Sequence, residues 1–120
     1  MKNDNVYLSQ IIDSIEKINN FINGINYQQF TVDQKTQSAV IMQLTLIGEL
    51  AKKISQETKS QINLPWKQIS GFRDRAIHDY YQIDIEIVWK TIEEDLLTLK
   101  NKIISAANEH EIILDNSKNK

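Results

Sequence analysis

The stretch GFRDRAIHDYY, residues 71–81, is the part of the sequence around which the rest of the chain is organised. The chain uses lysine for nearly all of its positive charge, and its only two arginines, Arg73 and Arg75, both lie in this stretch. His78, one of two histidines, follows them, with Tyr80 and Tyr81 shortly after it. The planar guanidinium group matches the geometry of phosphate oxygens, and an ammonium group replaces it poorly. Residues 71–81 are therefore a candidate phosphate-binding site.

The sequence predicts a short helix over residues 71–81, with Ser70 as its N-cap. In such a helix, positions four apart lie ~40° from each other around the axis, and positions five apart ~140°. One face then carries Arg73, Ile77 and Tyr80, and another carries Asp74, His78 and Tyr81. Arg75 and Asp79, four positions apart, are expected to form an ion pair on the surface. Arg73 and His78 reach one phosphate if Arg73 bends around the helix, if the helix ends near His78, or if two copies of the helix meet. We favour the last arrangement, a symmetric homodimer.

The remaining sequence is helical in pattern almost throughout, because apolar residues recur three and four positions apart. Long helices are predicted over residues 4–22, 33–59 and 84–108, with a short turn or one-turn helix over residues 27–30 and a short helical turn over residues 65–69. The expected N-caps are Asn3 or Asp4, Thr31 or Asp33, and Asp84, and Gly24 is expected to end the first helix. This pattern predicts an all-α fold, an up-and-down bundle of three long helices plus a short motif helix. We expect one domain over residues 1–110, with His110 exposed to solvent, and a polar C-terminal tail over residues 111–120.

Three apolar stripes are expected to form the core. The first is Leu8, Ile11, Ile12, Ile15, Ile18, Phe21 and Ile22, and the second is Val40, Leu44, Ile47, Leu50, Ala51 and Ile54. The third is Ile85, Val88, Trp89, Ile92, Leu96, Leu99, Ile103 and Ile104, and Trp66 is expected to anchor its segment in the same core.

Gly48 and Glu49 stand in the middle of the second long helix. A glycine there costs ~1 kcal/mol relative to alanine, which suggests that another helix approaches closely at this point. Two interpretations of Glu49 stay open. It either pairs on the surface with Lys52 or Lys53, one turn further on, or contacts the arginine-rich segment.

Composition excludes several classes of function. The 120 residues contain no cysteine, so disulfides, thiol nucleophiles and cysteine-based zinc sites are excluded. No run approaches the ~18 apolar residues of a membrane span, and no signal peptide is recognisable, so we expect a cytoplasmic protein. A net charge of -2 provides no overall attraction to nucleic acid, and any RNA must bind at a local patch.

The residues of the 71–81 stretch suit cleavage of RNA without a metal ion. The reaction needs a base for the 2′-hydroxyl proton, an acid for the leaving oxygen and positive charge on the phosphate. Two copies of His78 and Arg73 supply these groups in a dimer. Other interpretations remain: a lone histidine is more often structural, and Asp74 with His78 forms only half of a metal site. Tyr80 and Tyr81 are equally compatible with packing in the core and at its rim.

The spacing Arg-x4-His-x-Tyr, here Arg73, His78 and Tyr80, resembles the signature of the HepT-like toxins of the HEPN superfamily. Further stretches resemble the family in the expected order: residues 30–33 (FTVD), 47–52 (IGELAK), 65–69 (PWKQI) and 83–89 (IDIEIVW). The resemblance covers most of the chain and is more specific than a lone arginine and histidine.

The resemblance implies the toxin of a type VII-like HEPN/MNT toxin–antitoxin pair, a homodimeric, metal-independent endoribonuclease without a cofactor. The implied partners are an RNA substrate, such as tRNA or mRNA, and a minimal (MNT-type) nucleotidyltransferase antitoxin that transfers AMP onto Tyr80. The implied roles are phosphate binding for Arg73, acid–base catalysis for His78 and support by Asp74, with Arg75, Glu49 and Tyr81 as candidate accessory residues. The alternative function is a non-catalytic helical module that docks the nucleotidyltransferase and serves as its protein substrate.

Overall fold

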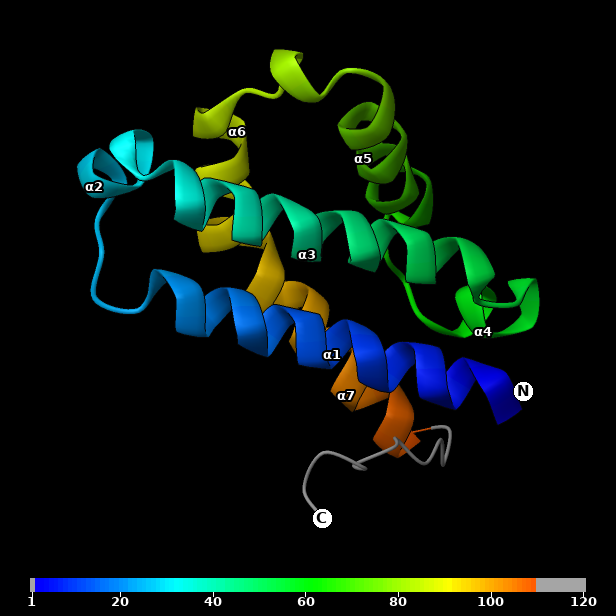
Figure 1. The fold of residues 1–120 in the computed structure, drawn as a ribbon. Coiled ribbons are helices and arrows are strands. Elements are labelled where there is room, and N and C mark those ends of the chain that lie inside the picture. The colour runs from blue at the N-terminus through cyan, green and yellow to red at the C-terminus, as the bar shows by residue number, and fades with distance from the viewer. Residues whose placement is uncertain (1, 110–120) are drawn as a thin grey trace.

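The computed structural model describes residues 2–109, and within that range it contains helices and turns but no strand (Figure 1). The helical elements are α1 (Lys2–Ile22), α2 (Tyr27–Val32), α3 (Gln34–Lys53), α4 (Gln56–Gln61), α5 (Trp66–His78), the short 3₁₀ turn η1 (Tyr80–Gln82), α6 (Ile85–Lys90), the π-helical segment η2 (Thr91–Asp95) and α7 (Leu96–Glu109). The predicted all-α bundle is confirmed. The expectations for His110 and for residues 111–120 lie outside the described residues.

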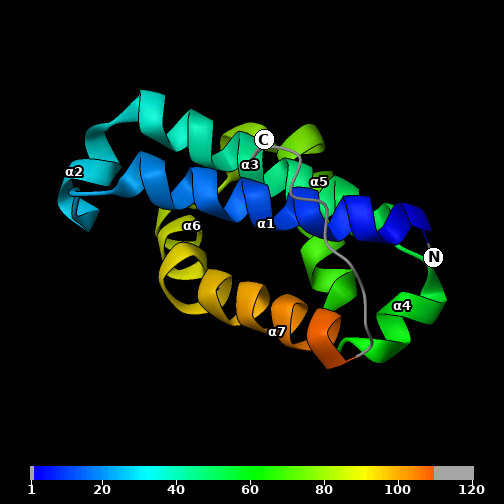
Figure 2. The ribbon, with the colours of Figure 1, turned by 90° about the horizontal axis from the view of Figure 1, so that it is seen from below.

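The long helix α3 is central, with α1 along one side and α5 packed against another (Figures 1 and 2). The last helix, α7, packs against α1 and closes the bundle from below in the view of Figure 1. None of the described helices combines the length and the apolar character that crossing a membrane would require.

The three predicted apolar stripes meet in one core. Its buried members include Leu8, Ile11, Ile15 and Ile18 from α1, Val40, Leu44 and Ile47 from α3, and Val88, Ile92, Leu96, Leu99 and Ile103 from the last helical stretch. The Phe30 ring stacks in a tilted contact 5.0 Å from the ring of Trp89. Two predicted core positions are wrong, because Phe21 and Ile104 are 40% and 36% exposed.

The connection between α1 and α3 largely follows the predicted signals. Gly24 has φ 82°, the left-handed conformation expected at the end of α1. The Asn26 side chain and Gln29 form a reciprocal capping box at the start of α2. This helix continues to Val32 rather than ending at residue 30, so Asp33, and not Thr31, caps α3 through the Thr36 backbone N–H.

The predicted helix over residues 33–59 is interrupted, and Asp4 explains why. The backbone of Ile54 is extended, and Ser55 starts the separate helix α4 as its N-cap. The buried Asp4 carboxylate accepts hydrogen bonds from the Ser55 N–H (3.1 Å), the Ser55 hydroxyl (2.6 Å) and the Thr58 hydroxyl (2.6 Å). Burial would raise the pKa of Asp4, but these hydrogen bonds outweigh it and lower the pKa below its ordinary value. Asp4 therefore ties α1 to α4 and does not cap α1.

The predicted break at Ser70 is also wrong, because α5 is one helix from Trp66 to His78. The Ser70 hydroxyl donates to the Trp66 carbonyl four residues earlier, a bond that leaves the helix intact. The Trp66 indole N–H donates to the carbonyls of Ile62 (3.0 Å) and Lys59 (3.3 Å), so the ring anchors the start of α5. The helix stops at His78, three residues earlier than predicted.

The last predicted helix begins as expected at its N-cap Asp84, whose side chain accepts from the Glu86 N–H at 2.9 Å. It contains a π-helical segment, in which each hydrogen bond spans one residue more than in an α-helix, and this changes the direction of the side chains that follow. Beyond it, Ala106 and Ala107 are buried near the end of the helix while Ile104 faces outward.

Gly48 marks the closest approach of α3 and α5, as its position in the sequence suggested. A Cβ atom on Gly48 would lie 2.8 Å from the Arg73 Cβ and 2.9 Å from the Ile69 carbonyl oxygen. Real Cβ contacts are almost never this short, so only glycine allows the two backbones to lie at this distance.

We expect Gly48→Ala to destabilise the fold. Overpacking costs ~1–3 kcal/mol, and the ~1 kcal/mol gained in helix propensity offsets only part of it. Gly71→Ala, in α5, is the matched control, because a Cβ there would meet nothing within 4 Å and should stabilise the helix. The free energy of unfolding of both variants is measured by urea titration, with circular dichroism as the signal. A Gly48→Ala protein as stable as Gly71→Ala would contradict the close approach.

Candidate functional site

Carboxylates on α3 and α5 hold the Arg73 side chain. Its Nε lies 2.8 Å from Glu49 Oε1, and its Nη1 donates to Asp74 Oδ1 at 3.2 Å. Lys52 Nζ donates to the same Asp74 oxygen at 2.7 Å. Hydrogen bonds from Lys52 and then from Arg73 lower the pKa of the Asp74 carboxyl. Of the two interpretations of Glu49, the contact with the arginine-rich segment is the one that forms, and the surface pair with Lys52 or Lys53 does not.

This arrangement leaves part of the Arg73 guanidinium group available. The Nε forms no hydrogen bond, so its contact with Glu49 is an ion pair in which the N–H does not point at the oxygen. Within the described residues, no hydrogen bond or ion pair involves Nη2. The side chain is 30% exposed but its Nε is buried, so Nη2 is the unpaired nitrogen that is available to an oxygen ligand from solvent.

His78 is the last residue of α5, and its side chain is exposed. Among residues 2–109 it has no hydrogen-bond or ion-pair partner, so both ring nitrogens are available to a ligand. Of the three arrangements considered from the sequence, the helix does end at His78. Arg73 and His78 nevertheless point in different directions, because five residues of α-helix separate their side chains by ~140°.

The two tyrosines lie in the 3₁₀ turn that follows α5. The Tyr80 hydroxyl lies 3.3 Å from the Ser38 hydroxyl at the start of α3, a distance at which either group can donate. Tyr80 is 43% exposed and Tyr81 97% exposed, and their rings meet edge to face at 5.7 Å. The prediction that Tyr80 shares a helical face with Arg73 is therefore wrong. The Tyr80 side chain is nevertheless partly exposed to solvent.

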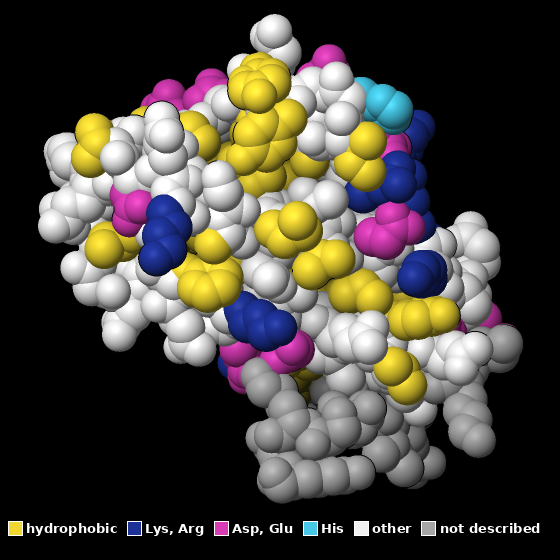
Figure 3. Space-filling view, viewed as in Figure 1, with side chains coloured by type: hydrophobic (Ala, Val, Ile, Leu, Met, Phe, Trp, Pro, Cys, Tyr) yellow, Lys and Arg dark blue, Asp and Glu magenta, His cyan; other side chains and the backbone are white. Residues whose placement is uncertain are grey.

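Exposed apolar side chains lie beside this end of α5. Because Tyr80 touches Ser38 and Arg73 lies against Gly48 and Glu49, α3 and α5 run antiparallel. Four residues in this region form what we term the apolar band: Met42 (57% exposed), Leu46 (41%), Ile77 (51%) and Tyr80. Figure 3 shows apolar side chains on this face, with basic side chains and the histidine along its edge.

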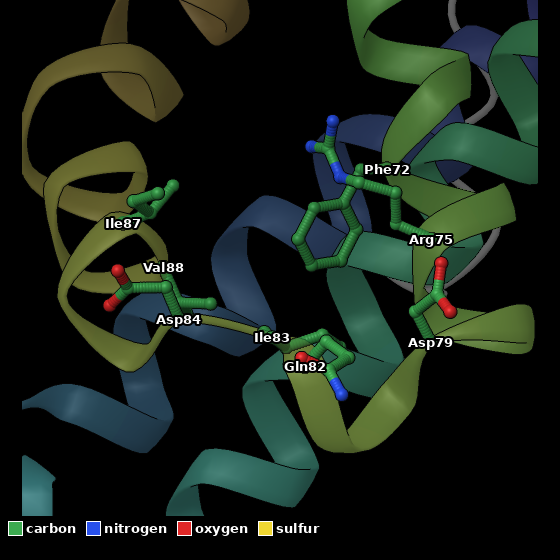
Figure 4. Close-up of a pocket in the computed structure, with 8 residues that line it drawn as sticks. All are labelled: Phe72, Arg75, Asp79, Gln82, Ile83, Asp84, Ile87 and Val88. Atoms are coloured by element: carbon green, nitrogen blue, oxygen red, sulfur yellow. The ribbon is translucent and has the colours of Figure 1, made fainter.

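The predicted ion pair between Arg75 and Asp79 does not form. Asp79 follows the last helical residue and has φ -133° and ψ 43°, so its side chain leaves the path expected one turn beyond Arg75. The Arg75 guanidinium instead lies over the Phe72 ring, 5.8 Å from its centre, and points away from the Asp79 carboxylate (Figure 4).

Arg75 also borders a cleft that the sequence did not reveal. The cleft has a volume of about 460 Å³ and lies between α5 and the start of α6, beside the turn that joins them (Figure 4). It is lined by Phe72, Arg75, Asp79, Gln82, Ile83, Asp84, Ile87 and Val88. Arg73, His78 and Tyr80 are not among these residues, so the cleft is separate from the predicted site. The signal for the cleft that the sequence offered is the set of apolar residues at positions 83, 87 and 88, which follow the polar turn.

Within residues 2–109, no group of three or more His, Asp or Glu side chains is arranged to hold a metal ion. Asp74, half of the pair suggested by the spacing with His78, instead accepts hydrogen bonds from Lys52 and Arg73.

Comparisons with known proteins agree over most of the chain. The family model described as "Ribonuclease HepT-like" matches residues 11–106. A protein of Thermococcus cleftensis named "Probable ribonuclease HepT" is 40% identical over 97 residues, which cover 80% of this chain and 88% of that protein. A protein of Caldanaerobacter subterraneus subsp. tengcongensis named "Putative RNase TTE0752" is 31% identical over 104 residues, or 86% of this chain and 93% of that protein. No solved structure matches the chain significantly. The chain therefore belongs to the ribonuclease HepT-like family.

Proposed function

We propose that this chain is an endoribonuclease that cleaves RNA without a metal ion, at a composite site formed by two copies of the chain. In this proposal Arg73 binds the scissile phosphate, His78 transfers protons, and the protein is the toxin of a toxin–antitoxin pair. The observation that carries the proposal is the second half of α5, which presents a partly free guanidinium group on Arg73 and, at its last residue His78, an exposed imidazole without a hydrogen-bond partner among residues 2–109. Membership of the ribonuclease HepT-like family supports the same reaction class.

The reaction is an intramolecular transesterification of the RNA backbone. A base takes the 2′-hydroxyl proton, the 2′-oxygen attacks phosphorus, and the bond to the 5′-oxygen of the next nucleotide breaks as an acid protonates that oxygen. The products are a 2′,3′-cyclic phosphate and a free 5′-hydroxyl. Imidazole performs both proton transfers near neutral pH. Each chain offers one histidine here, so the two His78 side chains of a dimer act as base and acid, and Arg73 stabilises the charge on the phosphate oxygens.

The apolar band supports dimerisation through this face. Exposed apolar side chains that cluster beside polar functional groups commonly mark a protein contact. Pairing of two apolar bands around a two-fold axis would bury Met42, Leu46 and Ile77 and bring the ends of the two α5 helices towards one composite site at the dimer interface. Such a contact would also compensate for the different directions of Arg73 and His78 within one chain.

Adenylylation of Tyr80 by an MNT-type nucleotidyltransferase is the proposed means of neutralisation. Each AMP adds about one negative charge. On Tyr80, two residues after His78, that phosphate would compete with substrate for the positive charge of the site. The half-exposed Tyr80 hydroxyl is compatible with this modification.

The nuclease proposal predicts RNA cleavage by the purified, unmodified protein in excess EDTA, with tRNA and mRNA as substrates. His78→Ala should lower the rate by ~10²–10⁴-fold, because it removes the proton-transfer group. Arg73→Ala should lower it by ~10²–10³-fold through loss of charge stabilisation. Lys67→Ala, at an exposed position in the first turn of α5, is the control and should cleave normally.

Intact mass and thermal unfolding of each protein establish that it is unmodified and folded. Full activity of His78→Ala, or activity that disappears in EDTA and returns with a divalent ion, would refute metal-independent catalysis by this histidine. Loss of all cleavage in an unmodified, dimeric wild type would favour the docking module instead.

The dimer proposal predicts that Leu46→Glu yields monomers and loses cleavage, because it places a charge in the middle of the apolar band. Leu97→Glu, at a 64% exposed position on α7, is the matched control and should remain dimeric and active. Sedimentation velocity reports the oligomeric state. A Leu46→Glu monomer that cleaves as fast as wild type would exclude a composite site.

The modification proposal predicts that a cognate MNT-type nucleotidyltransferase with ATP increases the mass of this protein by one or more AMP units. Tyr80→Phe should show no increase, and Tyr81→Phe, with the more exposed ring, should be modified like wild type. Intact-protein mass spectrometry measures both. Modification of Tyr80→Phe to the wild-type extent would place the acceptor elsewhere.

A further inference from the structure

The cleft between α5 and α6 has no part in the proposed chemistry, yet it opens close to it. Its rim residue Arg75 and the catalytic candidate His78 are three residues apart on α5, which makes them neighbours on the helix surface. An RNA strand with its scissile phosphate at His78 therefore passes the mouth of the cleft within about one helical turn.

The walls of the cleft suit a flat ring. On one side the Arg75 guanidinium lies over Phe72, and on the other the aliphatic side chains of Ile83, Ile87 and Val88 face them (Figure 4). Aromatic rings and guanidinium planes are the groups on which unpaired bases stack in single-stranded nucleic acid. The volume of about 460 Å³ lies within the ~300–1,000 Å³ of small-molecule sites.

The rim of the cleft carries polar groups without partners. Among the described residues, the side chains of Asp79, Gln82 and Arg75 form no hydrogen bond or ion pair, whereas Asp84 uses one oxygen to cap α6. The charges at the rim are one arginine against two aspartates. That balance disfavours an isolated phosphate and leaves carboxylate and amide acceptors for N–H donors.

We propose that this cleft binds one unpaired base of the RNA substrate, next to the scissile phosphate. The inference rests on the proposed nuclease function and adds a base-binding site to it. The base slides between Phe72 with Arg75 on one side and Ile87 on the other, and its polar edge faces Asp79 and Gln82. Because the Asp79 carboxylate only accepts hydrogen bonds, it pairs with the exocyclic amino group of cytosine and is repelled by the O4 carbonyl that uracil carries at the same ring position.

Cytosine and uracil provide the sharpest comparison, because they share one ring and differ at the amino group. Binding of fluorescent hexanucleotides of cytidine and of uridine is measured by anisotropy at one fixed salt concentration. All proteins carry His78→Ala, so that the RNA stays intact. The added variants are Arg75→Lys, which keeps the charge and loses the stacking plane, Ile87→Asn and Asp79→Ala, with the exposed Lys67→Gln as control.

We expect the His78→Ala parent to bind the cytidine hexamer several-fold more tightly than the uridine hexamer. Arg75→Lys and Ile87→Asn should weaken binding of the cytidine hexamer by ~10-fold, the typical effect of losing one stacked base. Asp79→Ala should remove the difference between the two RNAs, and Lys67→Gln should affect both RNAs slightly and equally. Thermal unfolding shows that each variant is folded, and Ile87 tolerates substitution because it is 57% exposed.

The inference is wrong if Arg75→Lys and Ile87→Asn bind both hexamers like the parent, or if the parent does not distinguish them. A change of oligomeric state in Ile87→Asn with unchanged RNA affinity would assign the cleft to a protein contact and would equally overturn it. Cleavage by the protein with His78 intact is measured in parallel. Normal cleavage without any effect of the cleft variants rejects the cleft alone, whereas base-dependent binding without cleavage rejects the nuclease and retains the cleft.

Discussion

The contact between the backbones of α3 and α5 at Gly48 is the constraint on which the candidate site depends. Because Gly48 has no side chain, the backbone of Arg73 lies directly against α3, and the adjacent Glu49 is within ion-pair distance of the guanidinium group. Lys52, one turn further along α3, reaches Asp74 from the same side. A wider spacing between the helices would break both contacts and leave Arg73 as a flexible surface side chain. The absence of a side chain at Gly48 thus fixes the direction of the Arg73 guanidinium group, the candidate phosphate-binding group.

The second constraint is the length of α5. The helix ends at His78, so Asp79 and the two tyrosines leave the helical path and lie around the end that carries the imidazole. Arg73 and Arg75, two residues apart, lie on nearly opposite sides of the helix. One helix end therefore serves two environments: an ion-paired guanidinium beside α3, and a guanidinium stacked on Phe72 at the edge of the cleft. The two arginines of the chain therefore have different contacts and different roles.

Sequence patterns predicted the fold class, the main apolar stripes and the close approach at Gly48, because these depend on helical periodicity and on a local cost in helix propensity. They missed the end of α3 at Lys53, because the break is stabilised by hydrogen bonds that the Asp4 carboxylate accepts from Ser55, fifty-one residues away. They also placed a helix start at Ser70, where the hydroxyl bonds within the helix instead. The Arg75–Asp79 pair failed because the prediction assumed that the helix continued beyond His78. The cleft depends on how two helices face each other across a turn, and spacing within either one does not encode that relation.

The 3₁₀ turn that carries Tyr80 has a consequence for any enzyme that must reach its hydroxyl. A modifying enzyme has to draw the tyrosine into its own active site, and a tyrosine in the middle of α5 would require several backbone bonds of the helix to open. In this turn the capping bonds are few, from the Gln82 N–H to Asp79 and from the Ile83 N–H to Tyr80. A modification of Tyr80 therefore requires fewer backbone hydrogen bonds to open than one within α5, and it leaves intact the helix that orients Arg73.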